Sequence, residues 1–345
     1  MRKKIINLVT YVLTFGLCIF LIWYSFKDLT TEQIDKIKFA VSKANYILLL
    51  PILIMGVISH WSRAVRWRYL MEPLGMQPSI ANTFFAVMIG YITNLMLPRA
   101  GEVIKCSILA KYEKTPVDKL VGTIIAERAF DMLCLVLIFV LTFLVQIDLA
   151  TDYTQTLLSK MNHNQNGEKS YTSYIVLACI VLVSILLYAF RKKIGNFAFF
   201  QKLKSVFENI LSGILSFKDM RNKKGFILHT FLIWAMYLGM IVLGFQSISE
   251  TSMLGYKTGL SVLSFGSFGM IVTPGGLGAY PLIVQEIVSL YLVNDSEGII
   301  SKAISWIIWL VPTVITILLG IISLILIPFY NRNKHASQQT TTHTK

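Results

Sequence analysis

Residues 259–293 read GLSVLSFGSFGMIVTPGGLGAYPLIVQEIVSLYLV, an apolar stretch interrupted in its middle by Pro274-Gly275-Gly276-Leu277-Gly278. A helix that crosses a bilayer needs about 20 consecutive apolar residues. Proline and glycine stop such a helix, and the freed backbone groups are tolerated at membrane depth only inside protein or against a wet cavity. The stretch from Gly259 to Val293 therefore predicts a broken helix that re-enters the membrane, not a single span.

A second stretch of the same kind lies earlier in the chain. Ile80 to Leu97 is apolar and is closed by Pro98-Arg99-Ala100-Gly101-Glu102. We expect another re-entrant hairpin here, which is the first of the two along the chain. Paired broken helices in matching positions of two halves are the best sequence pointer to a transporter's binding site.

Composition places these hairpins in a membrane protein. The 345 residues are 55% hydrophobic and 14% charged, with a mean hydropathy of +0.64, whereas soluble domains carry about 25% charged residues. The predicted fold is all-α, with about six full transmembrane helices and the two hairpins. The six spans are Ile5 to Phe26, Tyr46 to Trp61, Leu120 to Ile147, Tyr171 to Phe190, Phe226 to Ile248, and Ile299 to Ile327.

Charge distribution sets the expected orientation. With both hairpins re-entrant, the basic clusters at 2–4, 63–68, 105–119, 191–224 and 332–334 all fall on one side. The positive-inside rule makes that side cytoplasmic, together with both termini. A full crossing by Ile80 to Leu97 would break this pattern.

The same arrangement predicts a single transmembrane domain, residues 1–330, built as an inverted repeat. Its halves, about 1–150 and 165–330, each read span, span, broken hairpin, span, and three crossings per half turn the second half upside down. Residues 194–224 contain apolar positions at helical spacing beside lysines, which indicates an amphipathic cytoplasmic segment. The polar tail at 331–345 is expected to be disordered.

The sequence lacks the residue patterns that several classes of function require. The formal charge of +14 is explained by the cytoplasmic loops, so no nucleic-acid partner is expected. The four cysteines and five histidines are scattered, which argues against a disulfide framework or a metal site. Walker A, HExxH, GxSxG and dinucleotide glycine motifs are absent from the sequence, so we expect no cofactor and assign no catalytic residue.

The strongest local signal is Glu127-Arg128-Ala129-Phe130-Asp131, inside the third span. Glu127 and Asp131, like Arg128 and Asp131, are about one helical turn apart and can share a face. Ionisable groups at that depth are costly unless they face one another or a polar cavity. These three residues are therefore candidates for binding or transport; the alternative is a self-neutralised pair that joins two helices.

The two breaks supply the other candidates. At the first, Arg99 and Glu102 stand beside freed backbone groups; the alternative is an ordinary cytoplasmic turn. At the second, three glycines and a restarting helix suit an anion such as a lipid phosphate, although glycine also serves tight helix packing. The candidate headgroup-binding residues at the breaks are Asn94, Pro98, Arg99, Glu102, Pro274, Gly275, Gly276 and Gly278.

Arg63, Arg66 and Trp67 close the second span. We interpret them as positive-inside anchors with an interfacial tryptophan, and as secondary headgroup contacts.

In these motifs the chain resembles the transmembrane, flippase-like region of the lysylphosphatidylglycerol synthase family. The matching pieces, in order, are Arg63-x-x-Arg66-Trp67, Asn94-x-x-x-Pro98-Arg99-Ala100-Gly101-Glu102, Glu127-Arg128-x-x-Asp131 and Pro274-Gly275-Gly276-Leu277-Gly278. The chain departs from the family pattern in two places. The acidic residue that often follows the glycine run is not at Tyr280 or Pro281, and Trp309 stands where the last helix often has an arginine.

The resemblance implies a protein of the bacterial cytoplasmic membrane that handles an anionic or aminoacylated lipid. Members that make lysyl-phosphatidylglycerol carry a C-terminal aminoacyl-transferase domain, and this chain ends soon after Tyr330, so synthase activity is not expected. The leading hypothesis is a flippase-like transporter of a phospholipid or polyprenyl-linked lipid. The alternatives are a membrane-embedded transferase with Glu127 or Asp131 as base, and a non-transporting scaffold for envelope synthesis. Expected partners are membrane lipids, with an envelope-synthesis enzyme or a second copy of the chain as protein partner.

Overall fold

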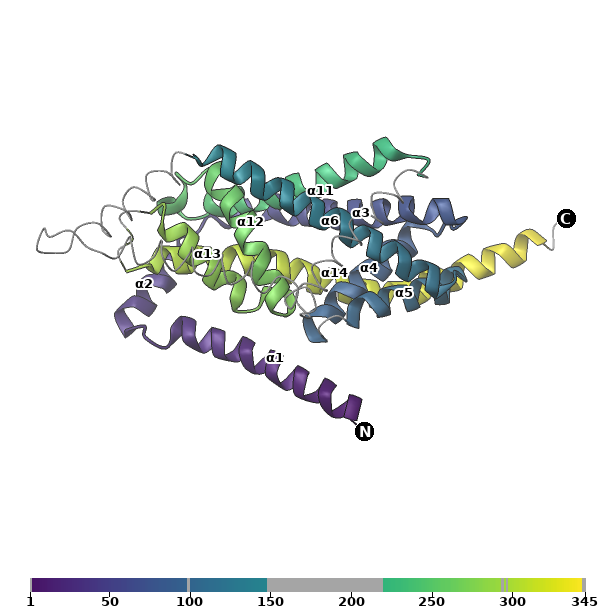
Figure 1. Cartoon of the computed structure of the whole chain (residues 1–345), viewed down its shortest axis with the longest axis horizontal. Coiled ribbons are helices and arrows are strands. Elements are labelled where there is room, and N and C mark those ends of the chain that lie inside the picture. The colour runs from purple at the N-terminus through teal and green to yellow at the C-terminus, as the bar shows by residue number, and fades with distance from the viewer. Residues whose placement is uncertain (1, 98–99, 148–219, 293–294, 296, 343–345) are drawn as a thin grey trace, which may run out of the picture. The chain divides into compact units, whose positions relative to one another are not determined.

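The computed structural model describes residues 2–97, 100–147, 220–292, 295 and 297–342, and every regular element in them is a helix (Figure 1). The chain divides into two compact units, Met1–Arg128 with Ser216–Lys345, and Ala129–Leu215. The described part of the second unit is the end of one helix, residues 129–147. The architecture below is that of the first unit.

Fourteen helical elements cover the described residues. Up to the third predicted span they are α1 (Arg2–Phe26), α2 (Thr31–Ser42), η1 (Tyr46–Leu48), α3 (Leu49–Met71), η2 (Glu72–Leu74), α4 (Ile80–Met96), α5 (Ala100–Glu113) and α6 (Val117–Val145). The remainder are α11 (Lys223–Phe245), η3 (Ser249–Thr251), α12 (Tyr256–Val272), η4 (Pro274–Gly276), α13 (Ala279–Ser289) and α14 (Ile299–Thr342).

The predicted all-helical membrane fold is confirmed. Among the described residues, four helices are long and apolar enough to cross a bilayer, namely Tyr46–Leu74, Val117–Val145, Lys223–Phe245 and Ile299–Arg332. A fifth candidate is the pair α1 and α2, which bends by 100° at its break. The predicted span Tyr171 to Phe190 and most of the predicted amphipathic segment lie outside the described residues.

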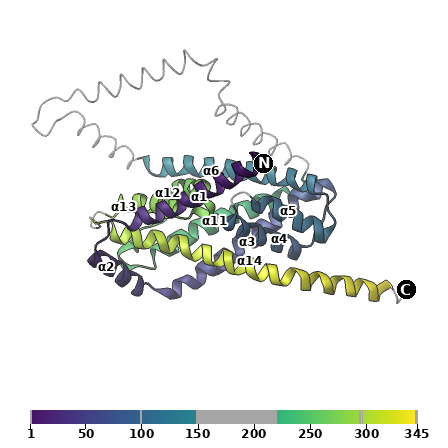
Figure 2. The same cartoon turned by 90° about the horizontal axis from the view of Figure 1, so that it is seen from below.

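The first predicted hairpin is formed by α4 and α5, which pack side by side (Figure 2). Two glycines let their backbones approach: a Cβ added at Gly101 would lie 2.0 Å from the carbonyl oxygen of Gly90. Small residues at helix contacts serve this purpose in membrane proteins. The Asn94 side chain accepts a hydrogen bond from the amide of Gly101 at 2.9 Å, so α4 itself caps the helix that follows the break.

The second hairpin is formed by α12 and α13, joined through η4. Gly275, Gly276 and Gly278 have φ angles of +58°, +74° and +77°, a region that glycine enters without steric cost. The turn brings the start of α13 against α12, where a Cβ at Gly269 would lie 2.7 Å from the backbone of Tyr280. The turn glycines thus form the break, and Gly269 allows α12 and α13 to pack tightly. An anion site at the turn stays a prediction.

Two boundaries differ from expectation. The second predicted span ends at Trp61, but α3 continues to Met71 because the charged side chains beyond Trp61 find partners inside the protein. Where we expected an unstructured tail from residue 331, α14 continues to Thr342. Buried Asn331 holds the start of this extension, since it exchanges hydrogen bonds of 2.8 and 2.9 Å with fully buried Asn82 of α4. The opposite orientation of the two halves stays a prediction.

Candidate functional site

A buried ionic cluster joins three helices of the first unit. Arg63 and Arg66 of α3 each approach Oε1 of Glu127 on α6, at 3.2 and 3.3 Å. Lys105 of α5 approaches Oε2 of the same carboxylate at 2.9 Å. All four residues are at least nine-tenths buried, and Arg66 is 0% exposed. We refer to Arg63, Arg66, Lys105 and Glu127 as the basic cluster.

Neighbouring side chains fix the geometry of the basic cluster. The Lys105 ammonium lies 4.1 Å from the centre of the Trp67 ring, close enough for a cation–π interaction. The indole nitrogen of Trp67 donates to the Thr123 hydroxyl on α6 at 2.8 Å. Arg63 also donates to the hydroxyl of Tyr237 on α11, at 3.2 Å. These contacts extend the basic cluster into a polar network that joins α3, α5, α6 and α11.

An exposed ion pair lies on α5 and α6, two of the helices that carry the basic cluster. Arg128 of α6 approaches Glu102 of α5 through Nε at 2.8 Å and Nη2 at 2.6 Å. Their side chains are 54% and 39% exposed. Glu102 is three residues before Lys105, and Arg128 follows Glu127, so this pair is the accessible neighbour of the basic cluster. It also stands at the start of α5, directly after the first break.

The two breaks approach each other in the first unit. A Cβ added at Gly275 would lie 2.1 Å from Cδ2 of Leu95, the next-to-last residue of α4. The Gly275 carbonyl accepts a hydrogen bond from the indole of Trp309 on α14, at 2.8 Å. The glycine turn of the second hairpin thus packs against the end of α4 and is held by α14.

The structure brings together many of the residues singled out in the sequence. Glu127 forms ion pairs with Arg63 and Arg66, and Arg128 forms one with Glu102. Gly275 lies against α4, the helix that carries Asn94. Pro98 and Arg99 lie outside the described residues. Asp131 belongs to the second unit.

Arg63, Arg66 and Trp67 differ from their interpretation as interfacial anchors. The structure places all three inside the protein, with Arg66 and Trp67 fully buried. Glu127 and Thr123 supply the polar contacts that make this burial tolerable.

Sequence reasoning missed Lys105, which it counted as a cytoplasmic loop cation. The buried positions of α5 are Gly101, Lys105, Cys106 and Leu109, a helical stripe in which lysine is the one charged member. A lysine inside such a stripe, three residues after Glu102, is the signal that would have found it.

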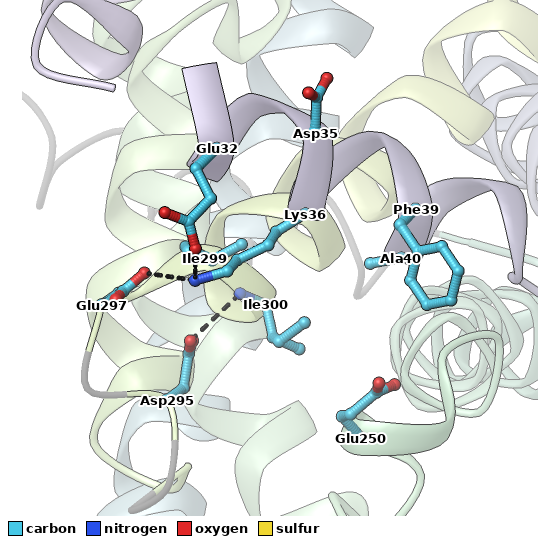
Figure 3. Close-up of a pocket in the computed structure, with 10 residues that line it drawn as sticks. All are labelled: Glu32, Asp35, Lys36, Phe39, Ala40, Glu250, Asp295, Glu297, Ile299 and Ile300. Carbon is cyan, nitrogen blue, oxygen red and sulfur yellow. Dashed lines mark hydrogen bonds and ion pairs between the residues drawn. The ribbon is translucent and has the colours of Figure 1, made fainter. Parts of the chain in front are cut away.

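A separate cavity of about 630 Å³ lies elsewhere in the first unit, between α2, η3 and the start of α14 (Figure 3). Lys36 lies in it, 2.9 Å from Glu32 and 3.5 Å from Glu297. The hydrogen bond with Glu32, with a further contribution from Glu297, raises the pKa of Lys36. Asp295 caps α14 by accepting from the amides of residues 300 and 301. The lining of the cavity includes five carboxylates and none of the candidate site residues from the sequence.

No group of three or more His, Cys, Asp or Glu side chains in the described part of the chain is arranged to hold a metal ion.

Comparisons with known proteins identify related membrane proteins. The chain is 22% identical over 324 residues to the UPF0104 membrane protein MJ1595 of Methanocaldococcus jannaschii, covering 85% of this chain and 89% of that protein. It is 25% identical over 305 residues to the UPF0104 membrane protein PH1989 of Pyrococcus horikoshii, covering 81% and 86%. No solved structure matches it. The family model described as the lysylphosphatidylglycerol synthase TM region matches residues 8–320, and the chain, a multi-pass membrane protein, belongs to this family.

Proposed function

We propose that the protein is a flippase-like transporter that moves an anionic or aminoacylated phospholipid, or a polyprenyl-linked lipid, across the cytoplasmic membrane. The observation that carries the proposal is the exposed pair Arg128–Glu102, backed by the basic cluster and placed at the first break. Charged groups within membrane segments mark substrate pathways by default. A headgroup phosphate would bind Arg128, and Glu102 would receive a cationic headgroup or a proton.

The contact between the two breaks supports the same proposal. Transporters built from repeats place their substrate sites where broken helices meet. Leu95 and Gly275 are the contacting residues here. The sequence contains no nucleotide-binding motif, so transport would follow a lipid or ion gradient, with the lipid stabilising one conformation over another.

The alternative of a membrane-embedded transferase requires a carboxylate that can take a proton from its substrate. Both oxygens of Glu127 accept contacts from cationic side chains, which leaves this carboxylate poorly placed as a base. Asp131, the other candidate base, lies in the second unit.

The proposal is tested by purified protein in liposomes that contain a fluorescent anionic lipid, with a membrane-impermeant quencher to report its leaflet. We expect lipid exchange above that of protein-free liposomes, and a loss of roughly tenfold for Arg128→Ala, the scale of one charge-assisted hydrogen bond. Lys111→Ala is the matched control, because Lys111 is an exposed cation further along α5.

Each alternative has its own outcome in these liposomes. A covalent change in the lipid, detected by mass spectrometry, would favour the transferase. An inert protein that copurifies with a lipid-processing enzyme would favour the scaffold. Exchange by Arg128→Ala at the parental rate would remove Arg128 from the substrate path.

A further inference from the structure

A lysine of α14 holds the end of α1 and has no acidic partner. Lys302 donates a hydrogen bond to the carbonyl oxygen of Ser25, and its ammonium lies 5.7 Å from the centre of the Phe26 ring. Within the part of the chain that the structure describes, no carboxylate forms an ion pair with Lys302. Asp28, which follows α1, is 84% exposed and pairs with Lys27 at 3.5 Å. Since an ammonium has three N–H donors, Lys302 can bind further acceptors.

Two more polar groups lie beside this lysine without a protein partner. Trp306 follows Lys302 by about one turn of α14, and its ring is 5.4 Å from that of Phe26. The indole nitrogen is buried, and none of the described residues accepts a hydrogen bond from it. The hydroxyl of Ser25, a residue that is 4% exposed, likewise has no partner among them. Because buried polar groups are nearly always hydrogen-bonded, three neighbouring donors indicate a shared acceptor.

Aromatic side chains at the end of α1 place these donors at the depth of lipid headgroups. Trp23 and Tyr24 are 58% and 51% exposed, and the Lys27 ammonium lies 5.5 and 5.1 Å from the centres of their rings. Exposed tryptophan and tyrosine gather at the headgroup level in membrane proteins. The chain then bends by 100° into α2, as expected where a helix reaches the membrane surface. The phosphate of a lipid headgroup is therefore the anion at hand.

We propose that Lys302, Trp306 and Ser25 form a binding site for the phosphodiester group of a membrane lipid. The single positive charge of Lys302 matches the single negative charge of a phosphodiester. The indole N–H and the hydroxyl donate to the phosphate oxygens. The site is separate from the Arg128–Glu102 pair of α6 and α5, and it requires lipid binding but not transport. It therefore goes beyond the proposed function.

Lys302 also has a structural role at the end of α1. The last carbonyl groups of a helix and its dipole favour a cation at the C-terminus, which accounts for the hydrogen bond to the Ser25 carbonyl. That role leaves the indole N–H of Trp306 and the hydroxyl of Ser25 without a function. Trp306→Phe separates the two roles, because it removes the N–H and keeps a ring against Phe26.

The experiment measures lipid binding to the full-length protein in detergent by native mass spectrometry. The probes are phosphatidylglycerol, a phosphodiester, and diacylglycerol with the same acyl chains, which has no phosphate. Inorganic phosphate is the water-soluble competitor. All proteins carry Arg128→Ala, so that the cation of the proposed transport site does not contribute. We expect phosphatidylglycerol to bind about tenfold more tightly than diacylglycerol, the scale of one charge-assisted hydrogen bond.

Variants connect this preference to the three donors. Lys302→Met removes the charge, so we expect the preference to disappear. Trp306→Phe should weaken the binding of phosphatidylglycerol about fivefold, the scale of one neutral hydrogen bond. Lys38→Gln is the control, because Lys38 is a lysine of α2 whose side chain is 71% exposed. A melting temperature for each variant separates loss of binding from loss of folding.

The outcomes separate this inference from the proposed function. Equal binding of the two lipids, or a preference that survives in folded Lys302→Met, overturns the inference whatever the rate of lipid exchange. Unchanged binding by folded Trp306→Phe overturns the site of three donors and leaves Lys302 as a helix cap. Binding of inorganic phosphate without phosphatidylglycerol assigns the donors to a soluble anion and overturns the lipid site. The expected preference in a protein that exchanges no lipid supports the inference and counts against transport.

Discussion

Replacing Glu127 by alanine leaves Arg63, Arg66 and Lys105 gathered in the protein interior without the carboxylate that they share. Removal of one partner from a buried ion pair costs about 3 to 5 kcal/mol, because an uncompensated charge remains. We expect Glu127→Ala to lower the free energy of unfolding by that amount, measured by denaturation in mild detergent.

Glu250→Ala is the control for this measurement, since Glu250 is an exposed carboxylate on η3. Exposed substitutions usually change stability by less than about 0.5 kcal/mol. Adding Lys105→Met to Glu127→Ala should recover part of the loss, because one buried cation is then absent. Parental stability of Glu127→Ala would mean that the three cations do not depend on Glu127.

The residues of the site were predictable from sequence to the extent that their chemistry is local. Glu127 and Arg128 stand out because charge is rare inside an apolar run. The partners of Glu127 cannot be recognised in the same way, since Arg63 lies 64 residues and Lys105 lies 22 residues away in the sequence. The interpretation of Arg63 and Arg66 as surface anchors followed from position along the chain, which carries no information on the carboxylate that α6 brings to them.

At the scale of helices, the turn of the second hairpin depends on a position that only glycine fits. Gly275 has a φ of +58°, and a Cβ there would lie 2.1 Å from Cδ2 of Leu95. The left-handed backbone alone costs an alanine roughly 1 to 2 kcal/mol, and the overlap adds to it. We expect Gly275→Ala to be destabilising by at least that amount and to slow lipid exchange in liposomes.

A second substitution separates the two causes. Leu95→Ala removes the atom that the new Cβ would meet. The double variant Gly275→Ala with Leu95→Ala should therefore recover the part of the stability loss that comes from steric overlap. The part that comes from the left-handed backbone should remain. Gly122→Ala within α6 is the control, because a Cβ there meets nothing within 4 Å. If Gly275→Ala were as stable and as active as Gly122→Ala, the close contact between the breaks would be unimportant.

Both hairpins were predictable as elements because proline and glycine mark where an apolar helix must stop. Their packing was less predictable, since the contacts of Gly90 with Gly101, and of Gly275 with Leu95, depend on which helix faces pack together in the folded protein. The extension of α14 was missed for a related reason. A polar sequence after residue 330 gives no sign that Asn331 will pair with Asn82, 249 residues away.

For the molecule as a whole, the distribution of charge predicts which parts face each side of the membrane. Lys36 lies on α2 among the acidic residues of the cavity, in a segment expected outside. Lys111 lies on α5, in a segment expected in the cytoplasm. The positive-inside rule makes this assignment through the basic clusters, and it holds only if α4 and α5 form a re-entrant hairpin instead of a full crossing.

This topology is tested by single cysteines at Lys36 and Lys111, in a protein whose four native cysteines are replaced. We expect an impermeant maleimide to label Lys36→Cys in intact cells, and to label Lys111→Cys only after the membrane is opened. Labelling of both positions in intact cells would put α5 outside. The hairpin at α4 and α5 would then have to be a crossing, and the two halves would lose the inverted relation from which a shared site was inferred.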